Sequence, residues 1–136
     1  MNNESLKARY DEMHSKGSSS WFSDGCEERE TILDIGEPWK GLRVLEIGCG
    51  EGDLCNMIHD RGALVLGIDY SGAAIAKAHG KFESELGGTL DFMTINFHKY
   101  TSENSDRIVM QGVLEHLDDP FTELQWMINN LSLIHI

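Results

Sequence analysis

The feature that most constrains the fold is an apolar run that ends in three closely spaced glycines. Residues 42–47 form a mainly apolar, β-rich run, Gly48, Gly50 and Gly52 follow, and a helical pattern begins at Glu51. Glycine accepts positive φ and, having no Cβ, leaves main-chain N–H groups open to a ligand. A strand, a tight glycine turn and a helix in this order predict a βα unit that binds a ligand at the carboxyl end of its strand.

The rest of the chain continues this alternation. Apolar runs predict strands at residues 42–47, 64–68, 90–95 and 107–110. Helices are predicted at residues 27–35, 51–60, 72–86, opened by Ser71 as N-cap, and 121–130. Short apolar strands separated by helices are typical of parallel sheets, and right-handed crossovers give the order 3-2-1-4. We therefore expect an α/β fold, the N-terminal part of a Rossmann-like doubly wound parallel sheet with helices on both faces.

The chain divides into one domain and two flanking segments. Residues 27–130 hold every predicted element, whereas residues 1–26 mix Ser, Gly and charge with a few aromatics, which is typical of a mobile arm or lid. Residues 131–136 interrupt the pattern. The same residues result from translating CTGTCTCTTATACACATC, the transposon end used to prepare sequencing libraries. We therefore expect an adapter-derived tail, and the alternative is a natural strand or helix end.

Composition excludes several classes of function. The 11 basic and 23 acidic residues give a net charge of −12, which disfavours nucleic acids and anionic membranes as partners. No apolar stretch is long enough to span a bilayer, and the N-terminus lacks the apolar core of an export signal. The three cysteines form no CxxC pair, and the histidines have no metal-ligand spacing. We expect a soluble cytoplasmic protein without a metal.

Acidic residues follow the first two strands. Asp69 lies just past the second predicted strand, where a carboxylate can accept hydrogen bonds from both hydroxyls of a ribose; the alternative is a turn or N-cap role. Asp53 stands where the dinucleotide fingerprint needs glycine, and its charge opposes a pyrophosphate. Asn96, past the third strand, could pair with an adenine amino group or serve as a turn residue. A nucleotide-like ligand without phosphates is therefore favoured over NAD.

These residues resemble the class I methyltransferases that use S-adenosylmethionine. Residues 46–52, an acid followed by G-x-G-x-G, are similar to the first motif of that family, and residues 67–69 are similar to its second. Residues 106–120 are similar to the fourth-strand segment of its small-molecule branch, which includes quinone-biosynthesis enzymes. Members of the family normally have a longer sheet than the one predicted here. The resemblance therefore implies a methyltransferase truncated after its fourth strand, represented by its donor-binding half.

The resemblance also implies roles for individual residues. Glu46 would hold the amino group of S-adenosylmethionine, Asp69 would hold the ribose, and Tyr70 would lie beside the adenine. Asn96 stands where the family usually carries an acid. The full set of implied cofactor-binding residues is Glu46, Gly48, Cys49, Gly50, Gly52, Asp69, Tyr70, Asn96 and Gln111. Cys49 is expected to be a small loop residue, and Cys55 on the next helix is expected to pack.

The chemistry of sulfonium methyl transfer requires alignment of donor and acceptor and no metal. His116, which follows the fourth strand, is the candidate general base for a protonated acceptor. The alternative is that Glu115 and His116 support the loop by hydrogen bonds. The partner implied is a small-molecule methyl acceptor whose identity the sequence does not give.

Two other functions stay open at this stage. One is a non-catalytic S-adenosylmethionine-binding or interaction module, because an unpaired fourth strand can pair with another chain. The other is a nucleotide-dependent oxidoreductase, which Asp53 disfavours. If the sheet ends at its fourth strand, we expect self-association through that edge and no turnover by the chain alone.

Overall fold

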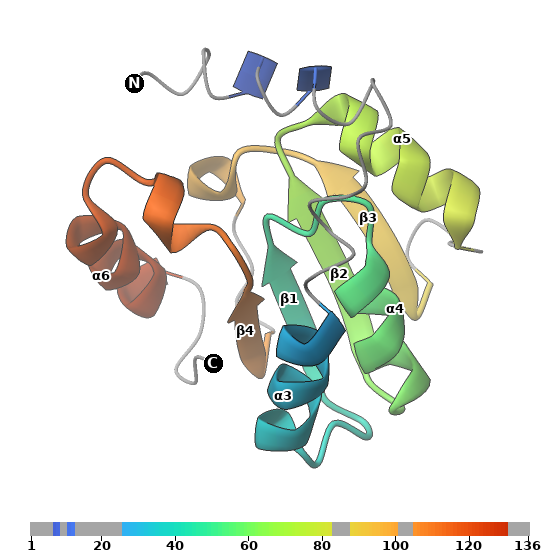
Figure 1. Cartoon of the computed structure of the whole chain (residues 1–136). Coiled ribbons are helices and arrows are strands. Elements are labelled where there is room, and N and C mark those ends of the chain that lie inside the picture. Colours follow the sequence, from blue (N-terminus) through green and yellow to red (C-terminus); the bar gives the residue numbers. More distant parts are fainter. Residues whose placement is uncertain (1–6, 9–10, 13–25, 83–87, 101–104, 131–136) are drawn as a thin grey trace.

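The computed structural model describes residues 7–8, 11–12, 26–82, 88–100 and 105–130. Its sheet contains β1 (Arg43–Ile47), β2 (Leu64–Asp69), β3 (Leu90–Thr94) and β4 (Arg107–Met110). Every neighbouring pair is parallel, and the order is β3-β2-β1-β4 (Figure 1). The predicted strand order and parallel pairing are confirmed.

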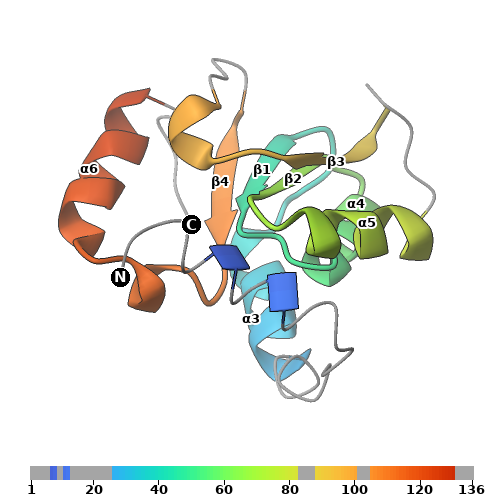
Figure 2. The ribbon, with the colours of Figure 1, turned by 90° about the horizontal axis from the view of Figure 1, so that it is seen from above.

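Helices cover both faces of the sheet. Four α-helices and two short 3-10 helices are described: α3 (Cys26–Gly36), α4 (Asp53–Asp60), α5 (Gly72–Lys81), η1 (Phe97–Lys99), η2 (Leu114–His116) and α6 (Pro120–Asn130). In Figure 2, α4 and α5 lie together on one side of the sheet, and α6 lies beside β4. The Rossmann-like arrangement is therefore the one expected from the sequence.

The two faces of the sheet have separate apolar cores because successive strand residues point to opposite sides. Val44 and Val109 face the core that α3, α4 and α5 cover. Leu45 and Ile108 face the second core, in which Met127 of α6 is buried. Within the described ranges, no helix has the length and apolar character needed to cross a membrane.

Several element ends differ from the predicted ones. Helix α4 begins at Asp53, two positions later than predicted, because Gly52 is in the left-handed region with φ 88°. Helix α5 ends at Lys81, whereas the prediction continued to residue 86, because Phe82 has extended backbone and packs against the first core. Residues 83–86 of that prediction lie outside the described residues, as does the predicted tail at 131–136.

Candidate functional site

The turn after β1 is shaped by its glycines. Gly48, Gly50 and Gly52 all have positive φ. The N–H of Gly48 donates to the carbonyl of Ile68 at 2.8 Å, which ties the turn to the end of β2. A Cβ on Gly48 would lie 2.4 Å from Cγ2 of Val113, so glycine is needed there for the loop after β4 to approach. The turn thus brings the carboxyl ends of β1, β2 and β4 together.

Asp69 connects the two loops that surround this turn. Its buried carboxylate accepts the N–H of Gly50 on Oδ2 and the N–H of Ser71 on Oδ1, each at 2.9 Å. Both donors are backbone N–H groups of the flanking loops, and they hold the carboxylate in one orientation. The turn role that was the alternative for Asp69 is therefore present, and its ribose role stays a prediction.

Glu46 is the second buried carboxyl at this edge of the sheet. It is 3% exposed, and Cys55 Sγ donates to its Oε2 at 3.3 Å. Burial raises the pKa of Glu46 to about 8, although the bond from Cys55 and the charge of Arg29 lower it. At neutral pH the group is therefore mainly protonated, and a cation placed against it would favour its ionised form.

The N-terminal segment reaches the same edge. Ser71 caps α5, as predicted, by accepting the N–H of Ala74 on Oγ at 3.2 Å. Its hydroxyl also donates to Asp11, whose carboxylate accepts the N–H of Ala73 as well. Burial alone would raise the pKa of Asp11, but hydrogen bonds from Ser71, Lys7 and Ala73 outweigh it, and the pKa is lowered. This contact could not be predicted from sequence, because Asp11 and Ser71 are sixty positions apart.

Asn96, Gln111 and Tyr70 are the other side chains predicted to bind the cofactor. Asn96 Oδ1 accepts the N–H of His98 at 3.0 Å and so caps η1, which is its turn role. Gln111 Nε2 donates to Glu28 on α3 at 3.1 Å. Tyr70 follows Asp69 directly and is half-buried. The ligand roles of these three residues stay predictions.

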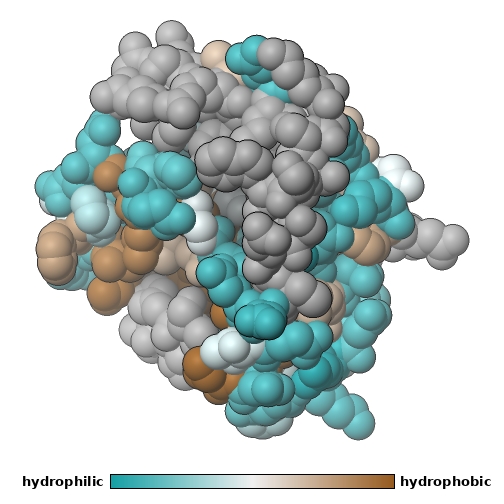
Figure 3. All heavy atoms as spheres, viewed as in Figure 1, coloured by the Kyte–Doolittle hydropathy of each residue, from teal (hydrophilic) through white to brown (hydrophobic). Residues whose placement is uncertain are grey.

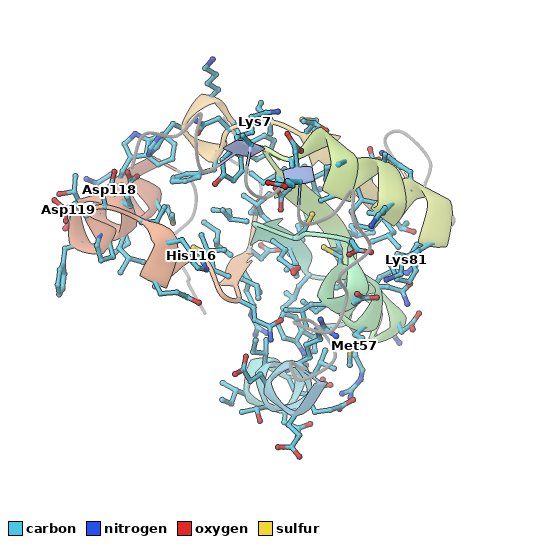
Figure 4. The ribbon with its side chains drawn as sticks, turned by 45° about the horizontal axis from the view of Figure 1, so that its top comes forward. Lys7, Met57, Lys81, His116, Asp118 and Asp119 are labelled. Atoms are coloured by element: carbon cyan, nitrogen blue, oxygen red, sulfur yellow. The ribbon has the colours of Figure 1, made fainter. Side chains whose placement is uncertain are left out.

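His116 lies on η2, between β4 and α6. Its side chain is 47% exposed, and its Nε2 is 4.0 Å from Oε1 of Glu115. Figure 4 places Asp118 and Asp119 farther from the sheet than His116, at the start of α6. The hydroxyl and N–H of Thr122 donate to Asp119 and lower its pKa, so this carboxylate serves the helix start. His116 thus lies nearer the sheet than these two aspartates, and its role as a base stays a prediction.

The rest of the described chain offers no competing metal chemistry. Among the residues with described positions, no three His, Cys, Asp or Glu side chains are grouped to hold a metal ion. Asp53, which replaces the third fingerprint glycine, is paired with Lys81 at 2.8 Å. The buried carboxyls and the glycine turn are therefore the chemistry that this edge of the sheet presents.

Comparison with known proteins places this site in a family. The sequence profile of a family described as "Methyltransferase domain" matches residues 44–131, which include the glycine turn, Asp69 and the η2 segment. A ubiquinone biosynthesis O-methyltransferase of Hahella chejuensis is 35% identical over 97 residues, covering 68% of this chain and 40% of that protein. The mitochondrial enzyme of that name from Rattus norvegicus is 30% identical over 104 residues, covering 73% of this chain and 30% of that protein.

Solved structures agree with this match. Magnesium protoporphyrin IX methyltransferase from Synechocystis PCC 6803, crystallised with S-adenosylmethionine, superposes with a TM-score of 0.58 at 30% identity, covering 75% of this chain and 48% of that one. The complex of DhpI with S-adenosylhomocysteine has a TM-score of 0.71 at 21% identity, covering 93% and 61%, and so supports the fold. The chain spans less than half the length of the curated relatives named above. It belongs to the class I S-adenosylmethionine-dependent methyltransferase family, in the branch that includes quinone-biosynthesis enzymes.

Proposed function

We propose that this chain binds S-adenosylmethionine and presents its methyl group to a small-molecule acceptor. The observation that carries the proposal is the pair of buried carboxyls, Glu46 and Asp69, at the ends of adjacent strands on either side of the glycine turn. One carboxyl fits an ammonium group and the other fits vicinal hydroxyls, and S-adenosylmethionine carries both kinds of group. Family membership supports the same donor.

Each residue has a defined task in this proposal. Asp69 accepts the ribose hydroxyls while its bonds to Gly50 and Ser71 fix its position. Glu46 accepts the ammonium group of the donor and gives up its proton as the cation arrives. Gly48 and Gly50 have no Cβ, so the methionine portion can lie against the backbone of the turn, although their N–H groups are bonded to Ile68 and Asp69 rather than open to the ligand. Cys49 and Gly52 complete the turn.

The reaction needs alignment and, for some acceptors, a base. Bound S-adenosylmethionine supplies a methyl group on a sulfonium, whose sulfur keeps the electron pair of the broken bond. The curated relatives are named O-methyltransferases, so a small-molecule hydroxyl is the first acceptor to test. His116 would take the hydroxyl proton, because it is half-exposed on the segment that follows β4.

Calorimetric titration tests donor binding. The chain is titrated with S-adenosylmethionine, S-adenosylhomocysteine and NAD, and we expect saturable binding of the first two and none of NAD. Binding of NAD with no binding of either adenosyl ligand would support the oxidoreductase alternative instead. Transfer of labelled methyl from S-adenosylmethionine to a panel of small phenols, amines and carboxylic acids then separates an enzyme from a non-catalytic binding module.

The proposal has three further parts, which concern the N-terminal segment, self-association and cellular location. We propose that the arm or lid predicted at residues 1–26 includes Asp11, whose contact with Ser71 supports this, and residues 1–6, 9–10 and 13–25 lie outside the described residues. We also propose self-association through the edge of β4, which pairs only with β1 in the described part of the chain. A cytoplasmic location is supported by the free thiols of Cys49 and Cys55 and is tested by cell fractionation.

A further inference from the structure

A buried thiol lies directly behind Glu46. Cys55 is on α4 and is fully buried, and its Sγ donates to Glu46 Oε2 at 3.3 Å. Gly67 of β2 makes room for this thiol, because a Cβ there would lie 2.7 Å from Cys55 Sγ and 2.9 Å from Cys49 Sγ. Cys55 thus makes a polar contact with Glu46 while it lies in an otherwise apolar core.

The charged and titratable groups that face Glu46 come from four places. Helix α3 supplies Arg29, α4 supplies Asp53 and Cys55, the glycine turn supplies Cys49, and β2 supplies Asp69. Arg29 attracts the ionised form of Glu46, whereas the two aspartates disfavour it. Cys55 differs from the charged groups because its thiol, which also has a hydrogen bond with Cys49, contacts one particular oxygen of the carboxyl.

We propose that Cys55 is a positioning residue for the donor site: its thiol fixes the orientation of Glu46 and favours the ionised form that receives the donor ammonium. The inference rests on the proposed binding of S-adenosylmethionine. Burial raises the pKa of the Cys55 thiol well above its usual value, so the thiol keeps its proton and remains a donor throughout the neutral range. The raised pKa also makes the thiol a poor nucleophile, which separates this role from covalent chemistry.

A purely structural role for Cys55 makes a different prediction. Loss of packing alone would lower stability and reduce the affinity for every ligand of the site to the same extent. Loss of the bond to Glu46 would reduce the affinity only for ligands that carry the ammonium group. It would also move the pH dependence of their binding upward, because Glu46 would then ionise at a higher pH.

Two ligands distinguish these cases. S-adenosylhomocysteine carries the ammonium group, and 5′-methylthioadenosine has the same adenosine and thioether without the amino-acid portion. Affinities of both are measured by calorimetry between about pH 6 and pH 9 for the unmodified chain, Cys55→Ala and Cys55→Ser. Ile58→Val is the matched control, because Ile58 is equally buried on the same helix and belongs to the apolar core. Melting temperatures of all variants are measured alongside.

We expect Cys55→Ala to weaken S-adenosylhomocysteine about threefold to tenfold at neutral pH, the usual size for loss of one hydrogen bond. Its affinity for 5′-methylthioadenosine should stay unchanged, and the pH midpoint for S-adenosylhomocysteine should rise. Cys55→Ser keeps a donor and should lie closer to the unmodified chain. Ile58→Val should lower the melting temperature and leave both affinities and the pH profile as they were.

If Cys55→Ala lowers the affinity for both ligands equally, or leaves the pH profile of binding unchanged, the positioning role is overturned. The donor site itself would remain in place. If the unmodified chain binds neither ligand, the proposed function fails and this inference fails with it. If Cys55→Ala does not fold, Cys55→Val, which fills the space without a donor, replaces it with the same expected results.

Discussion

The two edges of the candidate site are built in different ways. At the ends of β1 and β2, Glu46 and Asp69 are 3% and 6% exposed, and each accepts a hydrogen bond from the surrounding core or loops. On the segment after β4, His116 is 47% exposed, and Phe121 at the start of α6 is 84% exposed. The carboxyls of the first edge are thus buried and hydrogen-bonded, whereas His116 and Phe121 on the second edge are largely exposed.

This difference corresponds to two kinds of task. In the proposed function, recognition of a fixed donor needs acceptors held in one geometry. Backbone N–H groups hold Asp69 in this way, and the Cys55 thiol holds Glu46. An acceptor side has to admit different molecules, and half-exposed side chains on a short 3-10 segment suit that need. Changes at the first edge should therefore cost more than changes at the second, which the following four experiments test.

The largest effect is expected for Gly52→Val. The new Cβ would lie 2.6 Å from Phe92 Cε1, and the backbone is at φ 88°, so clash and strain combine. We expect the free energy of unfolding to fall by about 3 kcal/mol or more in urea titrations. Gly41→Val is the matched control, because Gly41 has φ 77° with no neighbour within 4 Å. Equal losses in the two variants would show that strain alone matters and that the turn is not tightly packed.

Asp69→Ala comes next. Loss of a charge-assisted acceptor for two ribose hydroxyls should weaken S-adenosylmethionine by about 2 to 4 kcal/mol in calorimetry. Gly50→Val should do at least as much harm, because it puts a side chain into the turn at φ 56°. Asp34→Ala on the exposed face of α3 is the control. Unchanged affinity in both site variants would place the donor elsewhere.

The parts of this edge that could be predicted from sequence are those encoded by neighbouring residues. The glycine turn, the Ser71 cap and the strand order follow from local pattern and from the handedness of crossovers. The bond from Cys55 to Glu46 could not be predicted, because the apolar pattern of α4 gives a thiol only a packing role. The contact of Asp11 with Ser71 joins distant residues, and no periodicity reports such a pair.

The pH dependence of stability distinguishes the buried carboxyl of the first edge from the exposed carboxyl of the second. The folded-state pKa of Glu46 is about 8, above its usual 4.5, so the folded state keeps a proton that the unfolded state loses. The stability that protonated Glu46 contributes to the folded state is fully present below about pH 4.5. It is lost as pH rises through about 8. Between these values the unmodified chain should lose up to about 1.4 kcal/mol per pH unit relative to Glu46→Gln.

Urea unfolding at several pH values measures this slope. Glu115→Gln is the control from the other edge, because its carboxylate is 62% exposed. Glu46→Gln should remove the fall in the free energy of unfolding with pH, and Glu115→Gln should not. The opposite result for either variant would contradict the contrast between a buried and an exposed carboxyl.

The smallest effect on stability is expected at the second edge. Phe121 and Ile128 of α6 are 84% and 48% exposed, and hydrophobic residues gather over α6 beside β4 in the surface view (Figure 3). Replacing both by Ser should change the free energy of unfolding by about 0.5 kcal/mol or less, because little is buried. The same change should shift the chain toward monomer in size-exclusion chromatography if copies associate beside the β4 edge. Ile35→Ser on α3, at a site 69% exposed, should leave the elution volume unchanged. If Ile35→Ser loses association and the α6 variant keeps it, the contact between copies lies away from β4. The second edge would then be free for an acceptor.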